Sequence, residues 1–147
     1  MKDVVVPVDR AQDASRAAAQ AIARYRREPV RIHVLNVQRP LPGHIARFFG
    51  TDDLRDFHRE AGMRVLQPLI ARLAEAGIPY QEHVLVGKPA EAIVDFAAQQ
   101  NGAEVLLDDE PDSMLAVVGL GSIGSQVRRL MTAHTATASG AGASGAM

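Results

Sequence analysis

Short apolar runs alternate with longer amphipathic segments along most of the chain, and this alternation constrains the fold more than any other feature. The apolar runs cover residues 3–8, 30–37, 80–86 and 104–107. Segments with the apolar spacing of a helix cover residues 14–27, 51–76 and 90–100, and another begins near Gly121. Such alternation is typical of parallel strands joined by crossover helices. The sequence therefore predicts an α/β protein with an open, doubly wound parallel sheet of four strands, flanked by four helices.

Local signals predict how the helices begin and which side chains they bury. Asp13 is the expected N-cap of the first helix and Thr51 that of the second. Gly62 and Pro68 lie inside the second helical segment, so a kink or a break is expected there. The buried stripe of that segment is expected to consist of Leu54, Phe57, His58, Ala61, Val65, Leu69, Ile70 and Leu73. The arginines of the first helix, at positions 16, 24, 26 and 27, are expected to form a solvated face.

Composition excludes several classes of protein. The chain has 147 residues, 16 basic and 17 acidic side chains and no cysteine. The balanced charge gives no field that would attract nucleic acid or an anionic membrane, and the missing cysteine excludes disulfides, thiol catalysis and thiolate metal sites. No apolar run approaches the ~20 residues of a membrane span, and no cleavable signal precedes the first strand. We therefore expect a cytoplasmic protein.

The composition changes near the C-terminus. Residues 132–147 are mostly Thr, Ala, Ser and Gly, and no strand can be recognised there. Such a segment has little apolar surface to bury, so we expect it to be disordered. The predicted organisation is one domain over residues 1–131 and a low-complexity tail over residues 132–147.

Polar and small residues follow the predicted strands. Ligands of doubly wound sheets bind beyond the carboxyl ends of the strands, where the chain turns into the following helix. Asp9, Val37, Gly87 and Asp108 stand at those ends. The sequence therefore predicts one crevice around these four residues.

Four blocks of sequence carry a resemblance to a known family. Residues 4–9 (VVVPVD) and 33–37 (HVLNV) resemble the first two strands of universal stress proteins, in which the aspartate reaches the bound nucleoside and the second strand borders the adenine. Residues 87–93 (GKPAEAI) are similar to their Gly-x-Pro-x-x-x-Ile helix start, and residues 102–107 (GAEVLL) to the strand before the phosphate loop. The resemblance covers residues 3–131 and places the chain in the adenine nucleotide alpha hydrolase-like superfamily. It implies the strand order 3-2-1-4 and a nucleotide crevice that includes Asp9 and Val37.

The phosphate loop departs from the family pattern. The family motif is glycine, two residues, glycine, nine residues, then glycine with serine or threonine. Counting back from Gly121 and Ser122 puts Asp108 and Pro111 at the first two glycine positions. A phosphate loop points backbone N–H groups at the ligand and leaves no side chain in between, whereas proline removes a donor and fixes φ. Gly121 and Ser122 keep a position for an anion at a helix start, or simply cap that helix.

Negative charge in the same loop adds to this departure. Asp108, Asp109, Glu110 and Asp112 fall within five residues. At about 5 Å and an effective dielectric of ~20, one repulsion with a phosphate is on the order of 3 kcal/mol before screening. A further departure follows the first strand, where Arg10 and Ala11 replace the Gly-Ser that the family often has.

Other chemistries fit less well. The acidic loop has oxygen ligands for Mg²⁺ or Ca²⁺, but it lacks the turn glycine of a metal loop, so a solvated loop and no metal site are expected. A phosphoacceptor role as in receiver domains would need the acidic pair after the first strand instead of the fourth. The five histidines share no ligand spacing, and no serine lies in a triad pattern, so no catalytic residue is expected.

The leading hypothesis is a non-catalytic stress-response domain that acts through protein contacts and has an impaired or lost nucleotide site. The alternative is a sensor that binds ATP or AMP through Asp9, Val37, Asp108, Gly121 and Ser122, with a divalent ion such as Mg²⁺ between the acidic loop and the phosphates. An adenylating or hydrolysing enzyme of the wider superfamily is a third possibility. The family usually ends in a fifth strand that commonly builds the dimer; because none is recognisable, the fourth strand is expected to be an edge. A homodimer or another protein partner is expected, without nucleic acid or membrane.

Overall fold

The computed structural model of the chain describes residues 1–107 and 125–132. It divides into two units, Met1–Asp108 and Asp109–Met147. In the second unit, residues 125–132 are helical, which agrees with a helix after Gly121. Three predicted features lie outside the described residues: the start of that helix, the acidic loop and the tail from residue 133 onward.

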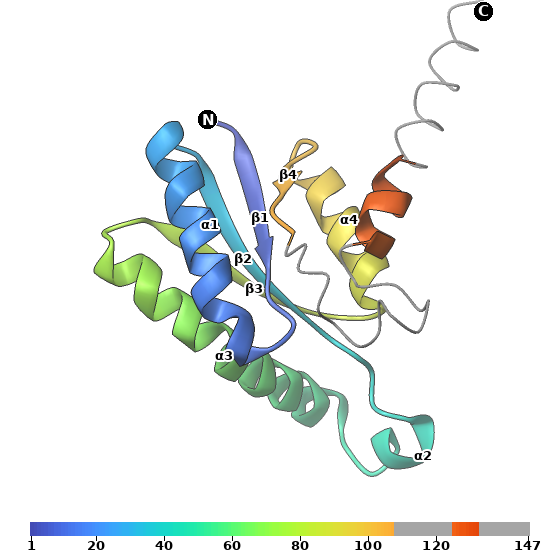
Figure 1. Cartoon of the computed structure of the whole chain (residues 1–147). Helices are drawn as coiled ribbons and strands as arrows, with labels where there is room; N and C mark the ends of the chain where they lie inside the picture. Colours follow the sequence, from blue (N-terminus) through green and yellow to red (C-terminus); the bar gives the residue numbers. More distant parts are fainter. Residues whose placement is uncertain (108–124, 133–147) are drawn as a thin grey trace, which may run out of the picture. The chain divides into compact units, whose positions relative to one another are not determined.

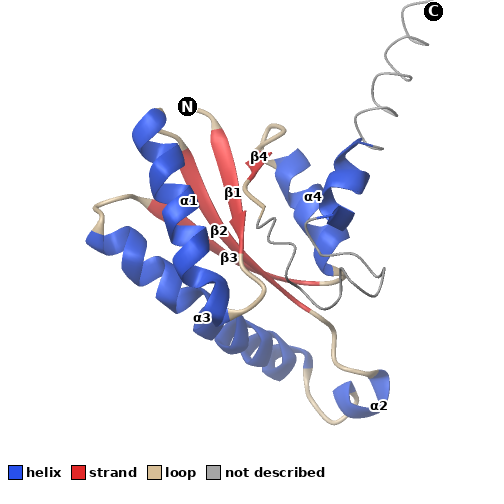
Figure 2. Cartoon of the chain, viewed as in Figure 1, coloured by secondary structure: helices blue, strands red, loops and turns tan. Residues whose placement is uncertain are grey.

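A parallel sheet forms the centre of the first unit (Figures 1 and 2). Its strands are β1 (Asp3–Pro7), β2 (Arg31–Gln38), β3 (Tyr80–Val86) and β4 (Glu104–Val105), in the order β3-β2-β1-β4. The predicted fold class and strand order are confirmed. The fourth strand has two residues, where four were expected at positions 104–107. Beyond it, among the described residues, the Leu106 amide still donates to the Val5 carbonyl at 2.9 Å.

Helices cover both faces of this sheet. The first crossover consists of a 3₁₀ turn, η1 (Ala11–Asp13), and helix α1 (Ala14–Arg27), and the second of the short α2 (Gly43–Ala46) and the long α3 (Thr51–Glu75). Helix α4 (Pro89–Gln99) joins β3 to β4. Figure 1 shows α1 and α3 on one face and α4 on the other. No described helix combines the length and hydrophobicity that crossing a bilayer requires.

The main core lies between the sheet and the pair α1 and α3. Alternate residues of β1 and β2 point into it, because successive side chains of a strand face opposite sides of the sheet. The largest fully buried side chains of the helix side are three leucines of α3. The buried core on this face consists of Val4, Val6, Val8, Ile32, Val34, Ala14, Ala18, Ala21, Val30, Leu66, Leu69, Ile70, Leu73 and Ile78. It is aliphatic, as a chain with 4% aromatic residues requires.

Helix α3 runs unbroken through both residues that suggested a kink. Gly62 is buried where the helix approaches the sheet most closely: a Cβ atom there would lie 2.5 Å and 2.7 Å from the two methyl groups of Val84. Pro68 lies on the exposed side of the helix. The glycine therefore permits close helix–sheet packing and does not interrupt the helix.

Asp13 takes the predicted N-cap position of α1, whereas the predicted N-cap Thr51 is wrong. The Asp13 side chain makes no capping bond and instead accepts hydrogen bonds from Arg10. Gly50, not Thr51, holds the N-cap position of α3, also without a side-chain bond. The turn η1 precedes α1 directly, so the backbone at Asp13 is already helical and its carboxylate is turned toward the preceding loop.

Two predictions of burial are also wrong. Phe57 was expected in the buried stripe of α3 and is 45% exposed. Leu66, which was not among the residues expected there, is fully buried. Arg24 was expected on a solvated face and is buried, with its guanidinium against Glu104 of β4. The second error arises because the position of β4 beside Arg24 cannot be read from the period of one helix.

Candidate functional site

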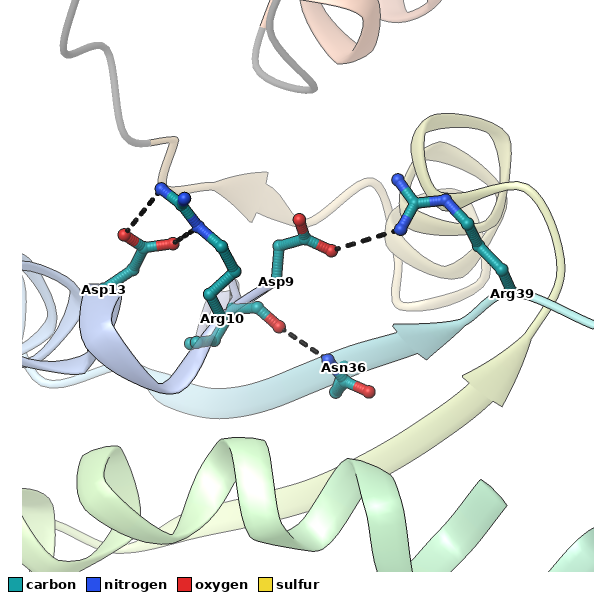
Figure 3. Close-up of polar contacts among 6 residues, drawn as sticks. Asp9, Arg10, Asp13, Asn36 and Arg39 are labelled. Carbon is teal, nitrogen blue, oxygen red and sulfur yellow. Dashed lines mark hydrogen bonds and ion pairs between the residues drawn. The ribbon is translucent and has the colours of Figure 1, made fainter. Parts of the chain in front are cut away.

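The candidate crevice begins where β1 ends. Past the strand, the Val8 amide donates to the Leu35 carbonyl at 2.9 Å, and the buried Asn36 donates from Nδ2 to the Val8 carbonyl at 2.8 Å. Gln38 in turn donates to Asn36 Oδ1 at 2.7 Å. Figure 3 shows Asn36 bonded to the backbone directly before Asp9. These bonds hold the chain extended up to the point at which Asp9 leaves the sheet.

Asp9 and Val37 both lie at the carboxyl ends of their strands. The ladder between β1 and β2 ends at the pair Pro7 and Leu35, and Asp9 and Val37 follow these two residues by two positions each. Val37 is buried in β2, while the Asp9 side chain is 39% exposed. The crevice edge therefore combines a buried apolar side chain with an accessible carboxylate.

Two arginines flank Asp9. The Arg39 guanidinium lies 3.9 Å from Asp9 Oδ1, and Figure 3 shows the two side chains pointing toward each other. Arg10 turns the other way and binds both Asp13 oxygens, at 3.3 Å and 3.4 Å. Of the two, only Arg39 is close to the Asp9 carboxylate, and both arginines remain largely exposed. Sequence reasoning missed Arg39 and Asn36. The available signal was the polar residues Asn36, Gln38 and Arg39 at the end of the second apolar run.

The turn from β3 into α4 completes this edge of the first unit. The Gly87 amide donates to the Gln38 carbonyl at 2.9 Å, which keeps the turn next to β2. Lys88 is exposed and takes the N-cap position of α4 without a side-chain bond, and Pro89 follows at the first helical position. A Cβ at Gly87 would meet only Ala92, at an ordinary 3.9 Å, so packing within the described chain does not require glycine there.

The phosphate side of the predicted crevice lies outside the described residues. Asp108, Gly121 and Ser122 belong to this part, as do the other acidic residues of the loop. Among the described residues, no three His, Cys, Asp or Glu side chains converge as a metal site. Of the predicted site residues, the structure describes Asp9 and Val37.

A second polar group lies on the face of the sheet that α4 covers. His33 Nε2 is 2.9 Å from Asp3 Oδ1, and His33 Nδ1 is 3.0 Å from His83 Nε2. Hydrogen bonding to His33 holds the pKa of Asp3 below its usual value, and burial lowers the pKa of His83. The sequence analysis assigned these histidines no joint role, because the residues are about 30 and 50 positions apart in the chain and meet only through strand pairing.

A known protein family and several solved structures match this chain. The chain matches the model of the universal stress protein family over residues 1–133. A universal stress protein solved in complex with cAMP is similar at 22% identity and a TM-score of 0.60, over 87% of this chain and 88% of that one. The Archaeoglobus fulgidus universal stress protein in complex with dAMP is similar at 23% identity and a TM-score of 0.56, over 86% and 88%.

A third solved structure has the same fold. The universal stress protein UspA from Lactobacillus plantarum shares 19% identity at a TM-score of 0.59, over 86% of this chain and 89% of that chain. No curated protein sequence matches the chain.

Proposed function

Because the chain belongs to the universal stress protein family, we propose that it is a non-catalytic stress-response domain that acts through protein contacts and whose nucleotide site is impaired. The observation that carries the protein-contact role is the exposed aromatic segment, residues 45–57. Three of the four phenylalanines of the chain lie in it, at positions 48, 49 and 57, together with Ile45, and all four side chains are exposed. Large apolar side chains gathered at the surface mark interaction sites more often than single ones do.

The exposed aromatic segment carries both positive and negative side chains. Such a surface can pair with a second copy of itself. Phe48 is 76% exposed and carries the Arg47 guanidinium 5.1 Å above its ring, a contact that desolvation in an interface strengthens. Arg55 lies 3.9 Å from Asp52, so the segment presents both signs of charge. We therefore propose a second copy of the chain as the partner, with a different protein as the other outcome of the test.

The impaired nucleotide site rests on the chemistry of the phosphate loop. Asp108 and Pro111 take the places of two glycines, and three more carboxylates follow within the same loop. Next to Asp9, Arg10 stands where the family often has a glycine, and its side chain is bonded to Asp13. A small residue at this position would let a ligand approach the backbone more closely. Repulsion of a few kcal/mol at close range would offset the gain from the remaining contacts.

The second candidate function is an adenine-nucleotide sensor. It is favoured by the exposed Asp9 carboxylate, whose described ion pair with Arg39 is long at 3.9 Å and therefore easily opened. Two similar structures were solved with cAMP and dAMP. In this reading Asp9 and Val37 hold the nucleoside, Gly121 and Ser122 the phosphates, and Mg²⁺ bridges Asp108 and its acidic neighbours to them. Either role is consistent with a cytoplasmic protein.

Titration calorimetry separates the two functions. ATP, AMP and cAMP would be titrated into the full chain with and without Mg²⁺. Heats without saturation in every condition support the impaired site, whereas saturable micromolar binding in any of them assigns the sensor.

Light scattering on a sizing column tests the protein contact. The chain is expected to elute as a dimer, and Phe48→Ser with Phe57→Ser is expected to shift it to the monomer mass. Val86→Ser, which changes an exposed apolar residue at the end of β3, is the matched control. A dimer that both variants leave intact contradicts the assignment of the contact to residues 45–57.

A further inference from the structure

Three titratable side chains form a continuous hydrogen-bonded chain across β1, β2 and β3. The Asp3 carboxylate accepts from His33 Nε2 at 2.9 Å, and the facing nitrogens of the two imidazoles, His33 Nδ1 and His83 Nε2, are 3.0 Å apart. Asp3 and His33 are almost completely buried, and His83, on the edge strand, is half-buried. The inner end of the chain is therefore a buried carboxylate and the outer end an imidazole near the surface.

The surroundings of the chain are mostly apolar on the α4 side. The Phe96 ring lies 4.6 Å from the His83 ring and 5.8 Å from the His33 ring, centroid to centroid. Among the described residues of the first unit, the charged or polar groups that act on it are few: Arg31 lies 3.3 Å from Asp3, Asn101 bonds Asp3 and Glu82 attracts a charge on His83. Arg31 and Asn101 stabilise the ionised form of Asp3, so the carboxylate stays a hydrogen-bond acceptor.

The geometry limits how many protons the chain can hold. With Asp3 ionised, His33 carries its proton on Nε2, and its neutral Nδ1 accepts a hydrogen bond from His83 Nε2. After one proton is added, one imidazole is a cation and the other is neutral. The cationic ring donates to the neutral ring, so a single hydrogen still lies between the two facing nitrogens. A second added proton gives each facing nitrogen its own hydrogen, and two N–H groups 3.0 Å apart cannot bond. The first proton is compatible with the folded contact and the second is not.

We propose that Asp3, His33 and His83 form a proton switch in which the second added proton breaks the His33–His83 bond and moves the His83 ring away from Phe96. Breaking this bond separates the edge strand from α4 on this face, while the seven-residue ladder between β2 and β3 remains. The lowered pKa of His83, caused by burial and by the charge of His33, agrees with a site that resists this protonation. Asp3 and His33 lie toward the amino-terminal ends of β1 and β2, and His83 lies in the middle of β3.

The test compares the pH dependence of unfolding in two variants. His83→Gln keeps an N–H that can donate to His33 but cannot take up a proton, and His44→Gln changes an exposed histidine in α2. Urea unfolding would be measured from about pH 8 to about pH 5. The unfolded chain protonates both imidazoles freely, whereas the folded chain takes up the second proton only by breaking the His33–His83 bond. The unfolding constant should therefore rise by up to about tenfold per pH unit below ~6.5 until the folded chain takes up that proton.

The expected result is that His83→Gln removes this rise and His44→Gln keeps it. Identical slopes for His83→Gln and the unchanged chain would overturn the proposal. If His83→Gln does not fold, imidazole NMR signals of the unchanged chain decide the question. Two coupled titration steps, with faster amide exchange of β3 in the more acidic one, support the switch. Independent single-step titration of both rings overturns it.

Discussion

The Arg24 guanidinium of α1 lies 2.7 Å from the Glu104 carboxylate of β4, and the two residues are 80 positions apart in the chain. The arginine side chain is 7% exposed and the glutamate 46%. Strand β4 has only two residues, and its ladder to β1 is correspondingly short. The ion pair thus connects the first helix to the strand that the sheet holds least firmly.

Replacing Glu104 by Gln should destabilise the fold by about 1–3 kcal/mol, because a nearly buried guanidinium loses its closest counter-charge. Glu28→Gln is the matched control, since Glu28 lies 3.9 Å from the same guanidinium and is more exposed; it should cost less than about 0.5 kcal/mol. Urea unfolding at neutral pH measures both. Equal effects of the two substitutions would show that the short contact to β4 has no special weight.

Gly62→Ala should destabilise the chain by about 1–3 kcal/mol, because the added methyl group collides with the stiff, branched Val84. Gly43→Ala, at a position in α2 with nothing within 4 Å, is the control and should be neutral or slightly stabilising. Thermal unfolding measures both. The double variant Gly62→Ala with Val84→Ala should recover part of the loss, and a strictly additive double variant would argue against the close approach of α3 to the sheet.

Asp3→Asn should lower stability at neutral pH and have a decreasing effect in acid. The folded pKa of Asp3 lies below its usual value of 3.8, chiefly through the His33 hydrogen bond, and so ionised Asp3 stabilises the fold above that value. This contribution is lost as the pH falls from 3.8 through the folded pKa. Unfolding curves of the variant and the unchanged chain should converge in that window, and a gap that stays constant with pH would contradict the prediction.

Restoring the two glycines of the phosphate loop should restore nucleotide binding. The double variant Asp108→Gly and Pro111→Gly returns a backbone donor and removes one negative charge, so the affinity for ATP should rise by at least about tenfold. Glu110→Gln removes a charge from the same loop without restoring the motif and serves as the control. Calorimetric titration of both variants measures the effect; a gain from Glu110→Gln alone would attribute the impairment to charge, not to the glycines.

Most of the fold could be predicted because the signals for it are local. The alternation of apolar runs and helical spacing predicted β1, β2 and β3 within one residue and placed α1 and α3 correctly. The end of the chain's fourth strand was predicted less well: Leu106 and Leu107 look like strand residues, but only Glu104 and Val105 pair with β1 in the ladder. Apolar character alone does not show whether a neighbouring strand continues.

The candidate site divides in the same way. The positions of Asp9 and Val37 at the carboxyl ends of parallel strands could be predicted from the alternation of strands and helices, while their role in binding a ligand stays a prediction. Arg39 beside Asp9 was missed because its contact depends on the path of the chain after β2. Phe57 was expected in the buried stripe of α3, but the stripe passes through its neighbour His58 and leaves Phe57 exposed.

The sequence by itself determined the strand and helix order and the aliphatic core, since each depends on residues close together in the chain. Only the tertiary structure decided that Arg24 meets Glu104, that Gly62 faces Val84 and that Asp3, His33 and His83 lie within hydrogen-bonding distance. These contacts join residues that are 22 to 80 positions apart. They arise from the strand register and from the position of each helix on the sheet. Both are set by the packing of the whole domain, and no local sequence pattern encodes them.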